Sequence, residues 1–317
     1  MTAASQPVIL APDDEGLARA ASLLRGGSLV AVPTETVYGL AARADSDEAV
    51  AAIYRAKGRP SFNPLIVHVA DLAAAGRIAV IDERAKLLAE RFWPGALTLV
   101  LPLRDDAGLA AAVTAGLPTV ALRCPAHPVM RKVLKVCGLP LAAPSANRSG
   151  AVSPTRPEHV ALSLGSAIAA IVDGGFCELG LESTIVALRE PGAWALLRPG
   201  PVSEAAIEAV LGPQDVQYPR ESRIEAPGQL ASHYSPGKPV RLDAEEAQAD
   251  EFHIGFGPVE GDANLSPSGD LAEAAARLYA VLHQAAQSPM PAVAVAPIPD
   301  EGIGKAIGDR LRRAAAP

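Results

Sequence analysis

The spacing of its short apolar runs constrains the fold of this chain most strongly. Ile168–Val172, Thr184–Leu188 and Ala193–Arg198 have the length and composition of buried strands. Several such runs follow one another too closely for a crossover helix, which a parallel pair of strands requires. Others, such as Leu65–Val69, alternate with helical segments. The sequence therefore predicts an α/β fold with a mixed sheet rather than a purely parallel one.

Helix start and stop signals divide the chain into three parts. Ser46-Asp47 is a typical cap for a helix that runs to Lys57, and Gly58 and Pro60 end it. After a helix over Ser203–Leu211, a stretch rich in proline, glycine and polar residues is typical of a connector. A shorter α/β pattern follows. We expect a catalytic domain over 1–211, a linker or lid over 212–238 and a small C-terminal α/β domain over 239–317.

Composition and charge exclude several classes of protein. Hydrophobic residues make up 49% of the chain and charged residues 20%, which is typical of a soluble globular protein. No apolar stretch reaches the ~18 residues that span a bilayer, and Met1–Gln6 does not begin a signal peptide. The three cysteines match neither a zinc pattern nor a disulfide framework. A net charge of −7 argues against broad binding to nucleic acid. We expect a cytoplasmic protein with reduced thiols.

Cationic residues recur beside the predicted strand ends. Lys57 and Arg59 flank Gly58 shortly before the strand that holds His68, while Arg123 and Arg198 each end a strand. One interpretation is that Lys57 and Arg59 only complement a helix dipole, which contributes less than ~1 kcal/mol. The other is that these cations converge on a pocket for polyphosphate or carboxylate groups.

Loops rich in hydroxyl groups accompany these cations. Residues 33–40 follow an apolar strand that Pro33 ends, residues 145–153 follow another strand, and residues 182–184 flank the strand that begins at Thr184. Such loops are either solvated turns or donors of N–H and O–H groups to phosphate oxygens. Glu35 has no partner carboxylate and is interpreted as a structural hydrogen-bonding residue. The chain has no P-loop and no H-E-x-x-H motif.

Taken in order, these motifs resemble those of YrdC-type threonylcarbamoyl-adenylate synthases. The resemblance spans about residues 16–211 and continues into the two-domain form through Ser232-His233-Tyr234-Ser235-Pro236 and residues 302–313. The motifs that carry it in the first domain are Pro33-Thr34-Glu35-Thr36-Val37-Tyr38-Gly39-Leu40, Lys57-Gly58-Arg59-Pro60, Asn63-Pro64-Leu65, Phe92-Trp93-Pro94-Gly95, Ser145-Ala146-Asn147-Arg148-Ser149-Gly150, Glu182-Ser183-Thr184-Ile185 and Leu197-Arg198-Pro199-Gly200.

The resemblance implies a twisted mixed sheet with a concave basic cavity, plus a smaller Rossmann-like C-terminal α/β domain. It implies an enzyme that makes L-threonylcarbamoyl-AMP from L-threonine, bicarbonate and ATP and releases pyrophosphate. The product serves threonylcarbamoyl modification of the adenosine beside the tRNA anticodon. We expect Mg²⁺ with ATP and a downstream threonylcarbamoyl transferase, and we expect no membrane partner and no stable nucleic-acid complex.

The resemblance also implies roles for individual residues. We expect Lys57 and Arg59 to act in catalysis. The residues implied to hold threonine are Thr36, His68, Arg123, Ala143 and Ser183. Those implied to bind ATP are Lys57, Arg59, Asn63, Thr119, Ser145, Asn147, Ser153, Arg198 and Tyr234. Tyr234, in the linker, would close over the mouth of the site as a lid.

Two alternatives are weighed against this function. A non-catalytic protein could use the basic cavity to bind double-stranded RNA or tRNA, but the acidic net charge disfavours it. A related carbamoyl-adenylate former for hydrogenase maturation would need additional acylphosphatase and zinc-finger-like modules. The three scattered cysteines supply neither.

Overall fold

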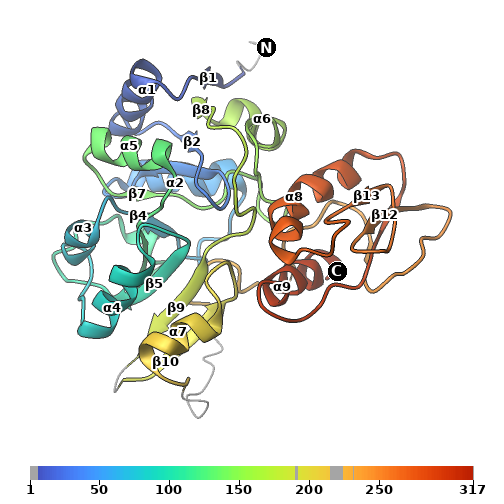
Figure 1. The fold of residues 1–317 in the computed structure, drawn as a ribbon. Helices are drawn as coiled ribbons and strands as arrows, with labels where there is room; N and C mark the ends of the chain where they lie inside the picture. Colours follow the sequence, from blue (N-terminus) through green and yellow to red (C-terminus); the bar gives the residue numbers. More distant parts are fainter. Residues whose placement is uncertain (1–5, 190–191, 215–223, 231, 317) are drawn as a thin grey trace.

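The computed structural model describes residues 6–189, 192–214, 224–230 and 232–316, and it contains two separate sheets (Figure 1). The larger sheet has ten strands in the order β1-β8-β2-β3-β7-β4-β6-β5-β9-β10. Their bounds are β1 Val8–Leu10, β2 Val30–Val32, β3 Gly39–Arg43, β4 Ile66–His68, β5 Leu97–Pro102, β6 Thr119–Arg123, β7 Leu141–Ala142, β8 Ala170–Val172, β9 Thr184–Leu188 and β10 Trp194–Arg198.

This sheet is mixed, as the sequence predicted. Strands β4 and β6 are parallel, whereas β7 runs antiparallel to β4, and β5 antiparallel to β6. The closely spaced β9 and β10 form an antiparallel pair, which needs no crossover helix. Because the sheet contains strands that run in both directions, the carboxyl ends of its strands do not all meet at one edge.

Helices connect and cover the strands. Asp13 and Ser46 cap α1 and α2 by accepting a hydrogen bond from Gly16 N and Ala49 N, and Gly58 ends α2 in the left-handed conformation. The remaining helices of this part are shorter than α1 and α2. The bounds are α1 Asp14–Arg25, α2 Asp47–Lys57, α3 Leu72–Gly76, α4 Glu83–Phe92, α5 Pro128–Cys137, α6 Pro157–Leu164 and α7 Glu204–Leu211.

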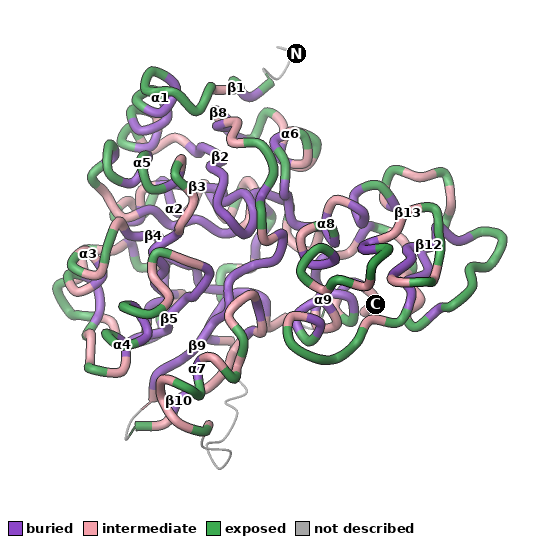
Figure 2. Tube along the Cα trace, viewed as in Figure 1, coloured by how far each residue is buried: buried purple, intermediate pink, exposed green. Residues whose placement is uncertain are grey.

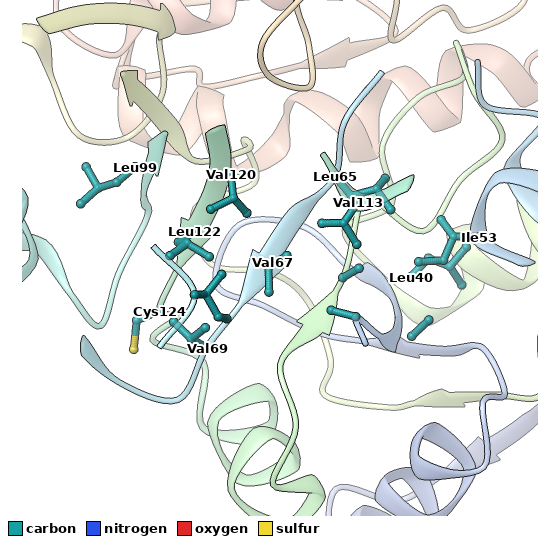
Figure 3. Packing of buried hydrophobic residues seen from close by; sticks show 14 of the residues in the cluster. Leu40, Ile53, Leu65, Val67, Val69, Leu99, Val113, Val120, Leu122 and Cys124 are labelled. Atoms are coloured by element: carbon teal, nitrogen blue, oxygen red, sulfur yellow. The ribbon is translucent and has the colours of Figure 1, made fainter. Parts of the chain in front are cut away.

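Alternation along the strands gives the sheet two different faces. One face carries Val67, Leu99 and Leu122, which belong to the largest apolar cluster of the protein (Figure 3). Helices α2 and α4 contribute to the same cluster. This face is therefore a conventional core, and the central strands are buried over most of their length (Figure 2).

The opposite face is covered in two ways. Helices α1 and α5 pack over its β2, β3, β7 and β8 part. Over β4, β5, β6 and β9 the cover includes Ala226 of the linker, which packs with Ile66, Ala121 and Ile185. A space between these two covers holds the polar side chains described below.

The C-terminal part forms a smaller parallel sheet with two helices. Its strand order is β11-β14-β12-β13, and every pairing is parallel. Its core extends into the first part, because Val37, Val152 and Leu181 belong to the same cluster. The bounds are β11 Val240–Arg241, β12 Glu251–Gly255, β13 Ala263–Asn264, β14 Ala292–Val295, α8 Leu271–Gln287 and α9 Gly304–Ala315.

Two further predictions can be compared with the described residues. Cys124, Cys137 and Cys177 are all buried free thiols, as expected. Within the described parts of the chain, no helix is both long and apolar enough to cross a bilayer.

Candidate active site

A small cavity lies on the face of the large sheet between its two covers. Its volume is about 40 Å³, which is room for only a few water molecules. The β2–β3 loop, β4, β6, the loop after β7 and the linker all contribute to its wall. The described lining consists of Thr34, Thr36, Val37, Gly39, Arg59, Ile66, His68, Arg123, Ala143, Pro144, Ser145, Glu182, Ser183, Arg198, Pro227, Gly228, His233 and Tyr234.

Arg123 lies at one end of this cavity and is held on three sides. Its Nη1 donates to Thr36 Oγ1 at 2.8 Å, its Nη2 to Glu35 Oε1 at 2.6 Å and its Nε to Gly95 O at 3.1 Å. The side chain is 4% exposed. A guanidinium group has further N–H groups beyond these three, so Arg123 can still bind a carboxylate in the cavity.

Glu35 is the residue that orients Arg123. Its Oε2 accepts hydrogen bonds from the backbone N–H groups of Ala126 and His127. Burial alone would raise the pKa of Glu35, but Arg123 and these N–H groups lower it below its usual value. Glu35 is therefore an ionised structural residue, as its lack of a partner carboxylate predicted.

His68 lies beside Arg123, since the two residues are register partners on β4 and β6. Burial, and then the charge of Arg123, lower the pKa of His68 to about 3, so its imidazole is neutral. Its Nδ1 is buried and has no partner among the described atoms. Buried polar atoms are normally paired, which makes this nitrogen a candidate contact for a small polar ligand.

Ser183 and Arg198 form a second polar group in the cavity wall. Ser183 Oγ lies 2.7 Å from Thr98 Oγ1 and accepts from Arg198 Nη2 at 3.1 Å, while Arg198 Nε donates to Ser183 O. Gly228 of the linker, at φ +84°, packs on Arg198, and a Cβ there would lie 2.9 Å from Arg198 Cδ. The linker backbone therefore approaches the guanidinium as closely as glycine permits.

Arg59 lies in the cavity wall, but Lys57 does not. Arg59 donates to Asn63 O, Asn63 Oδ1 and Pro64 O, and burial lowers its pKa to about 10. Lys57 donates instead to Ser145 O at 2.6 Å and Asn147 O at 2.5 Å. Since Gly58 turns the chain between them, the two cations point to different groups. The helix-dipole interpretation of Lys57 is also insufficient, because Lys57 is buried against the 145–147 loop.

The remaining predicted residues are divided between the cavity and its supports. Ala143 and Ser145 line the cavity. Asn147 donates to Arg148 O and Ala151 O, and Ser153 donates to Glu182, so both support neighbouring loops. Thr119 begins β6, and strand alternation places it on the face that carries Ala121 and Arg123. It lies outside the cavity lining, at the end of β6 away from Arg123.

Two linker residues close the cavity. His233 and Tyr234 both line it, and Tyr234 has the uncommon φ of +65°. The Tyr234 ring lies 5.5 Å from the ring of Tyr279 and 5.5 Å from the guanidinium carbon of Arg310. The linker is thus folded over the sheet in this structure, and the C-terminal part holds it there.

Glu182 and Arg310 were missed as site residues. Glu182 belongs to the motif Glu182-Ser183-Thr184-Ile185, for which only Ser183 had an expected role. In the structure Glu182 lines the cavity and pairs with Arg310 at 3.0 Å. Arg310 falls on the apolar stripe of α9 with Ile307, Leu311 and Ala314. The position of an arginine on this apolar stripe could have indicated a buried ion pair, because burying a charge without a partner is costly.

The arrangement favours ligands that carry carboxylate or phosphate groups. Three buried guanidinium groups, Arg59, Arg123 and Arg198, contribute to the cavity wall together with a neutral imidazole and several hydroxyl groups. Glu182 adds a carboxylate to the same wall, but it is already paired with Arg310. Guanidinium groups of this kind bind carboxylate and phosphate oxygens.

Two family models match the chain over most of its length. One, described as "Telomere recombination" and covering the Sua5, YciO and YrdC proteins, matches residues 22–200. The other, described as "Threonylcarbamoyl-AMP synthase, C-terminal domain", matches residues 202–316.

Similar proteins include curated enzymes and a solved structure. A threonylcarbamoyl-AMP synthase of Bacillus subtilis (strain 168) is 43% identical over 96% of this chain and 94% of its own. One of Pyrococcus abyssi (strain GE5 / Orsay) is 38% identical over 93% and 92%. The crystal structure of P. abyssi Sua5 complexed with L-threonine superimposes with a TM-score of 0.87 at 35% identity, over 97% of both chains.

Proposed function

The chain belongs to the YrdC-type threonylcarbamoyl-AMP synthase family, and we propose that it joins L-threonine, bicarbonate and ATP into L-threonylcarbamoyl-AMP with release of pyrophosphate. The observation that carries this proposal is the small cavity where Arg123 and His68 lie side by side and two further guanidinium groups contribute to the wall. The product serves threonylcarbamoyl modification of the adenosine beside the tRNA anticodon.

Threonine would bind at the Arg123 end of the cavity. The free N–H groups of Arg123 would hold its carboxylate, with Glu35 and Gly95 O keeping the guanidinium in place. Thr36, the unpartnered Nδ1 of His68, Ser183 and the backbone of Ala143 would add further polar contacts, since all four residues line the cavity. The neutral state of His68 suits a hydrogen bond with the threonine hydroxyl or ammonium group.

ATP would bind along the wall formed by Arg59, Ser145 and Arg198. Arg59 and Arg198 can neutralise phosphate charge, and Ser145 adds a hydroxyl group. Lys57 would act indirectly, since its ammonium group fixes the carbonyls of Ser145 and Asn147. Asn63, Asn147 and Ser153 lie outside the present lining, and Thr119 lies at the far end of β6 from Arg123, so contacts of these residues with ATP would require an opened site.

The reaction itself requires little covalent help from the protein. The neutral amine of threonine attacks bicarbonate and forms a carbamate with loss of water; a carbamate oxygen then attacks the α-phosphorus of ATP in line while pyrophosphate leaves. Positioning of the two substrates and neutralisation of charge therefore carry catalysis. The described residues include no group of three or more His, Cys, Asp or Glu side chains that could hold a metal ion. Mg²⁺ would enter with ATP and offset its phosphate charge.

The linker would act as a lid over these substrates. A cavity of about 40 Å³ is far smaller than the ~300 Å³ or more of typical ligand pockets, so the segment bearing Gly228, His233 and Tyr234 would open to admit ATP. Closure would then exclude water from a product that is easily hydrolysed. A downstream threonylcarbamoyl transferase would take that product.

The non-catalytic RNA-binding alternative is poorly supported by the position of the cations. The side chains of Arg59, Arg123 and Arg198 are all buried. Such groups cannot contact the phosphates of a duplex on the protein surface.

Pyrophosphate release tests the proposed reaction. Purified protein is incubated with MgATP, L-threonine and bicarbonate, and each of the two small substrates is omitted in turn from CO₂-free buffer. We expect release that depends on both. Release that continues without threonine or without bicarbonate would show a different ATP-cleaving activity.

A further inference from the structure

A buried cluster of polar groups joins the C-terminal domain to the wall of the active site. At its centre is Glu182, which precedes Ser183 and lines the cavity. Glu182 Oε1 accepts from Ser153 Oγ at 2.6 Å, and Oε2 accepts from Tyr279 Oη at 2.7 Å and Arg310 Nε at 3.0 Å. Two of these three donors, Tyr279 and Arg310, come from helices α8 and α9 of the C-terminal domain.

Arg310 links several parts of the site with one side chain. It is 0% exposed. Besides Glu182, its Nη2 donates to Pro199 O, the carbonyl that follows Arg198, and its Nη1 pairs with Asp309 at 2.7 Å. Its guanidinium carbon lies 5.5 Å from the ring centre of Tyr234, within the range of a cation–π contact. Arg310 thus contacts Glu182 in the cavity wall, the turn that follows Arg198, and the linker residue Tyr234.

The contact between the domains supplies the ion pair of this cluster, because Arg310 of α9 pairs with Glu182. Burial alone would raise the pKa of Glu182, but Arg310 and Arg198, together with the Ser153 and Tyr279 hydroxyl groups, lower it to about 2. Without Arg310 the carboxylate would lose the ion pair that keeps it ionised in the cavity wall.

The backbones of the two domains also meet at this point. Gly180 has φ +68°, and a Cβ built there would lie 2.5 Å from the Cα of Ala276 in α8. Only glycine permits so close an approach of the 180–184 segment to α8. Gly200 is equally confined, since a Cβ there would lie 2.5 Å from Thr184 N. The segment bearing Ser183 is therefore fixed between α8 on one side and the 198–200 turn on the other.

From these contacts we propose that Arg310 is a positioning residue for synthesis: it sets Glu182-Ser183, the Arg198-Pro199 turn and Tyr234 of the lid in one arrangement. The C-terminal domain, in this account, completes the active site without contacting either substrate. The inference rests on the proposed function, in which Ser183 binds threonine and Arg198 binds the nucleotide.

The test compares substitutions of Arg310 in the intact protein. Arg310→Met removes the guanidinium and keeps much of the volume, whereas Arg310→Lys keeps the charge but cannot reach Glu182, Pro199 O and Asp309 at once. Displacing reacting groups by ~1 Å can cost about 100-fold in rate, so we expect Arg310→Met to lower kcat/KM for threonine by about 10- to 100-fold. Arg310→Lys is expected to restore part of this loss.

KM for threonine separates positioning from a loss of folded protein. A variant that is only partly folded has a lower apparent kcat, but its folded molecules keep the wild-type KM. We expect KM for threonine, and Kd for threonine measured by calorimetry without ATP, to rise about fivefold or more in Arg310→Met, as for loss of ~1 kcal/mol of binding.

The chain offers a matched control in Arg241→Met. Arg241 pairs with the buried Glu251 at 2.5 Å within the C-terminal domain and lies outside the described cavity lining. This variant should keep the wild-type KM and Kd for threonine. If Arg310→Met does not fold, Tyr279→Phe serves instead, because it removes only the hydroxyl group that bonds Glu182.

Two failures are distinguishable. A wild-type protein that releases no pyrophosphate and binds no threonine would overturn the proposed function. An active wild-type protein whose Arg310→Met and Tyr279→Phe variants keep the wild-type KM and Kd for threonine would overturn the positioning role of Arg310 alone.

Discussion

Replacing Glu182 by glutamine should cost stability in a way that depends on pH. In the folded protein the pKa of Glu182 falls from an ordinary 4.5 to about 2. At ~1.4 kcal/mol for each pKa unit, this difference of about 2.5 corresponds to about 3 kcal/mol. The figure agrees with the ~3–5 kcal/mol lost when one partner of a buried ion pair is removed.

The direction of the pH effect follows from the lowered pKa. Because the folded state holds the Glu182 proton less tightly than the unfolded state, its contribution is complete above pH ~4.5 and is lost as the pH falls towards ~2. At pH 7, Glu182→Gln should therefore unfold with a free energy about 3 kcal/mol lower than the wild type. The gap between the two proteins should narrow as the pH decreases through this window.

Urea unfolding followed by circular dichroism, at neutral pH and at several values below pH 5, measures both effects. Asp45→Asn is a suitable control, since Asp45 pairs with Arg43 on the partly exposed surface. Such a pair contributes under ~1 kcal/mol. An equal free energy of unfolding for the wild type and Glu182→Gln at pH 7, or a gap that does not change with pH, would refute the reasoning.

Two other residues give sharp predictions. Arg59→Ala should raise KM for ATP by about tenfold or more, as for loss of ~1.4 kcal/mol of phosphate binding. It should also lower the melting temperature, because three hydrogen bonds to Asn63 and Pro64 are lost. An unchanged KM for ATP would show that Arg59 does not bind the nucleotide. His68, with its pKa near 3, should show no imidazole titration between pH 5 and 8 in an NMR experiment on the folded protein. Because the unfolded state takes up this proton below pH ~6.5, His68 should stabilise the fold less as the pH falls below that value, and a titration midpoint near 6.5 in the folded protein would contradict its burial.

Elements with strong local signals could be predicted from the sequence. Helix α2 begins after Ser46 and ends at Gly58 as expected. The elements that were missed have weak local signals. Strand β3 begins at Gly39 with no break from the preceding loop, and α3 has only five residues. Such segments are fixed by the strands and helices packed against them rather than by their own residues.

The candidate site was likewise predicted only in part. The motifs correctly indicated that Thr36, His68, Arg123 and Ser183 come together in one cavity. They did not indicate that Lys57 would turn towards backbone carbonyls, because that direction depends on where the 145–147 loop lies.

The contribution of the C-terminal domain could not be predicted at all. Arg310 and Glu182 are 128 positions apart, and no local pattern relates them. Their pairing follows from the packing of α8 and α9 against the first domain, which only the assembled structure contains.

The central claim is that this chain makes threonylcarbamoyl-AMP, and the most direct measurement is the identity of its product. Protein is incubated with MgATP, L-threonine and ¹³C-bicarbonate, and the reaction is analysed promptly by liquid chromatography and mass spectrometry. We expect threonylcarbamoyl-AMP that carries the ¹³C label and that is absent when threonine is omitted. AMP or ADP formed without any labelled adenylate, at enzyme concentrations that consume ATP, would contradict the account.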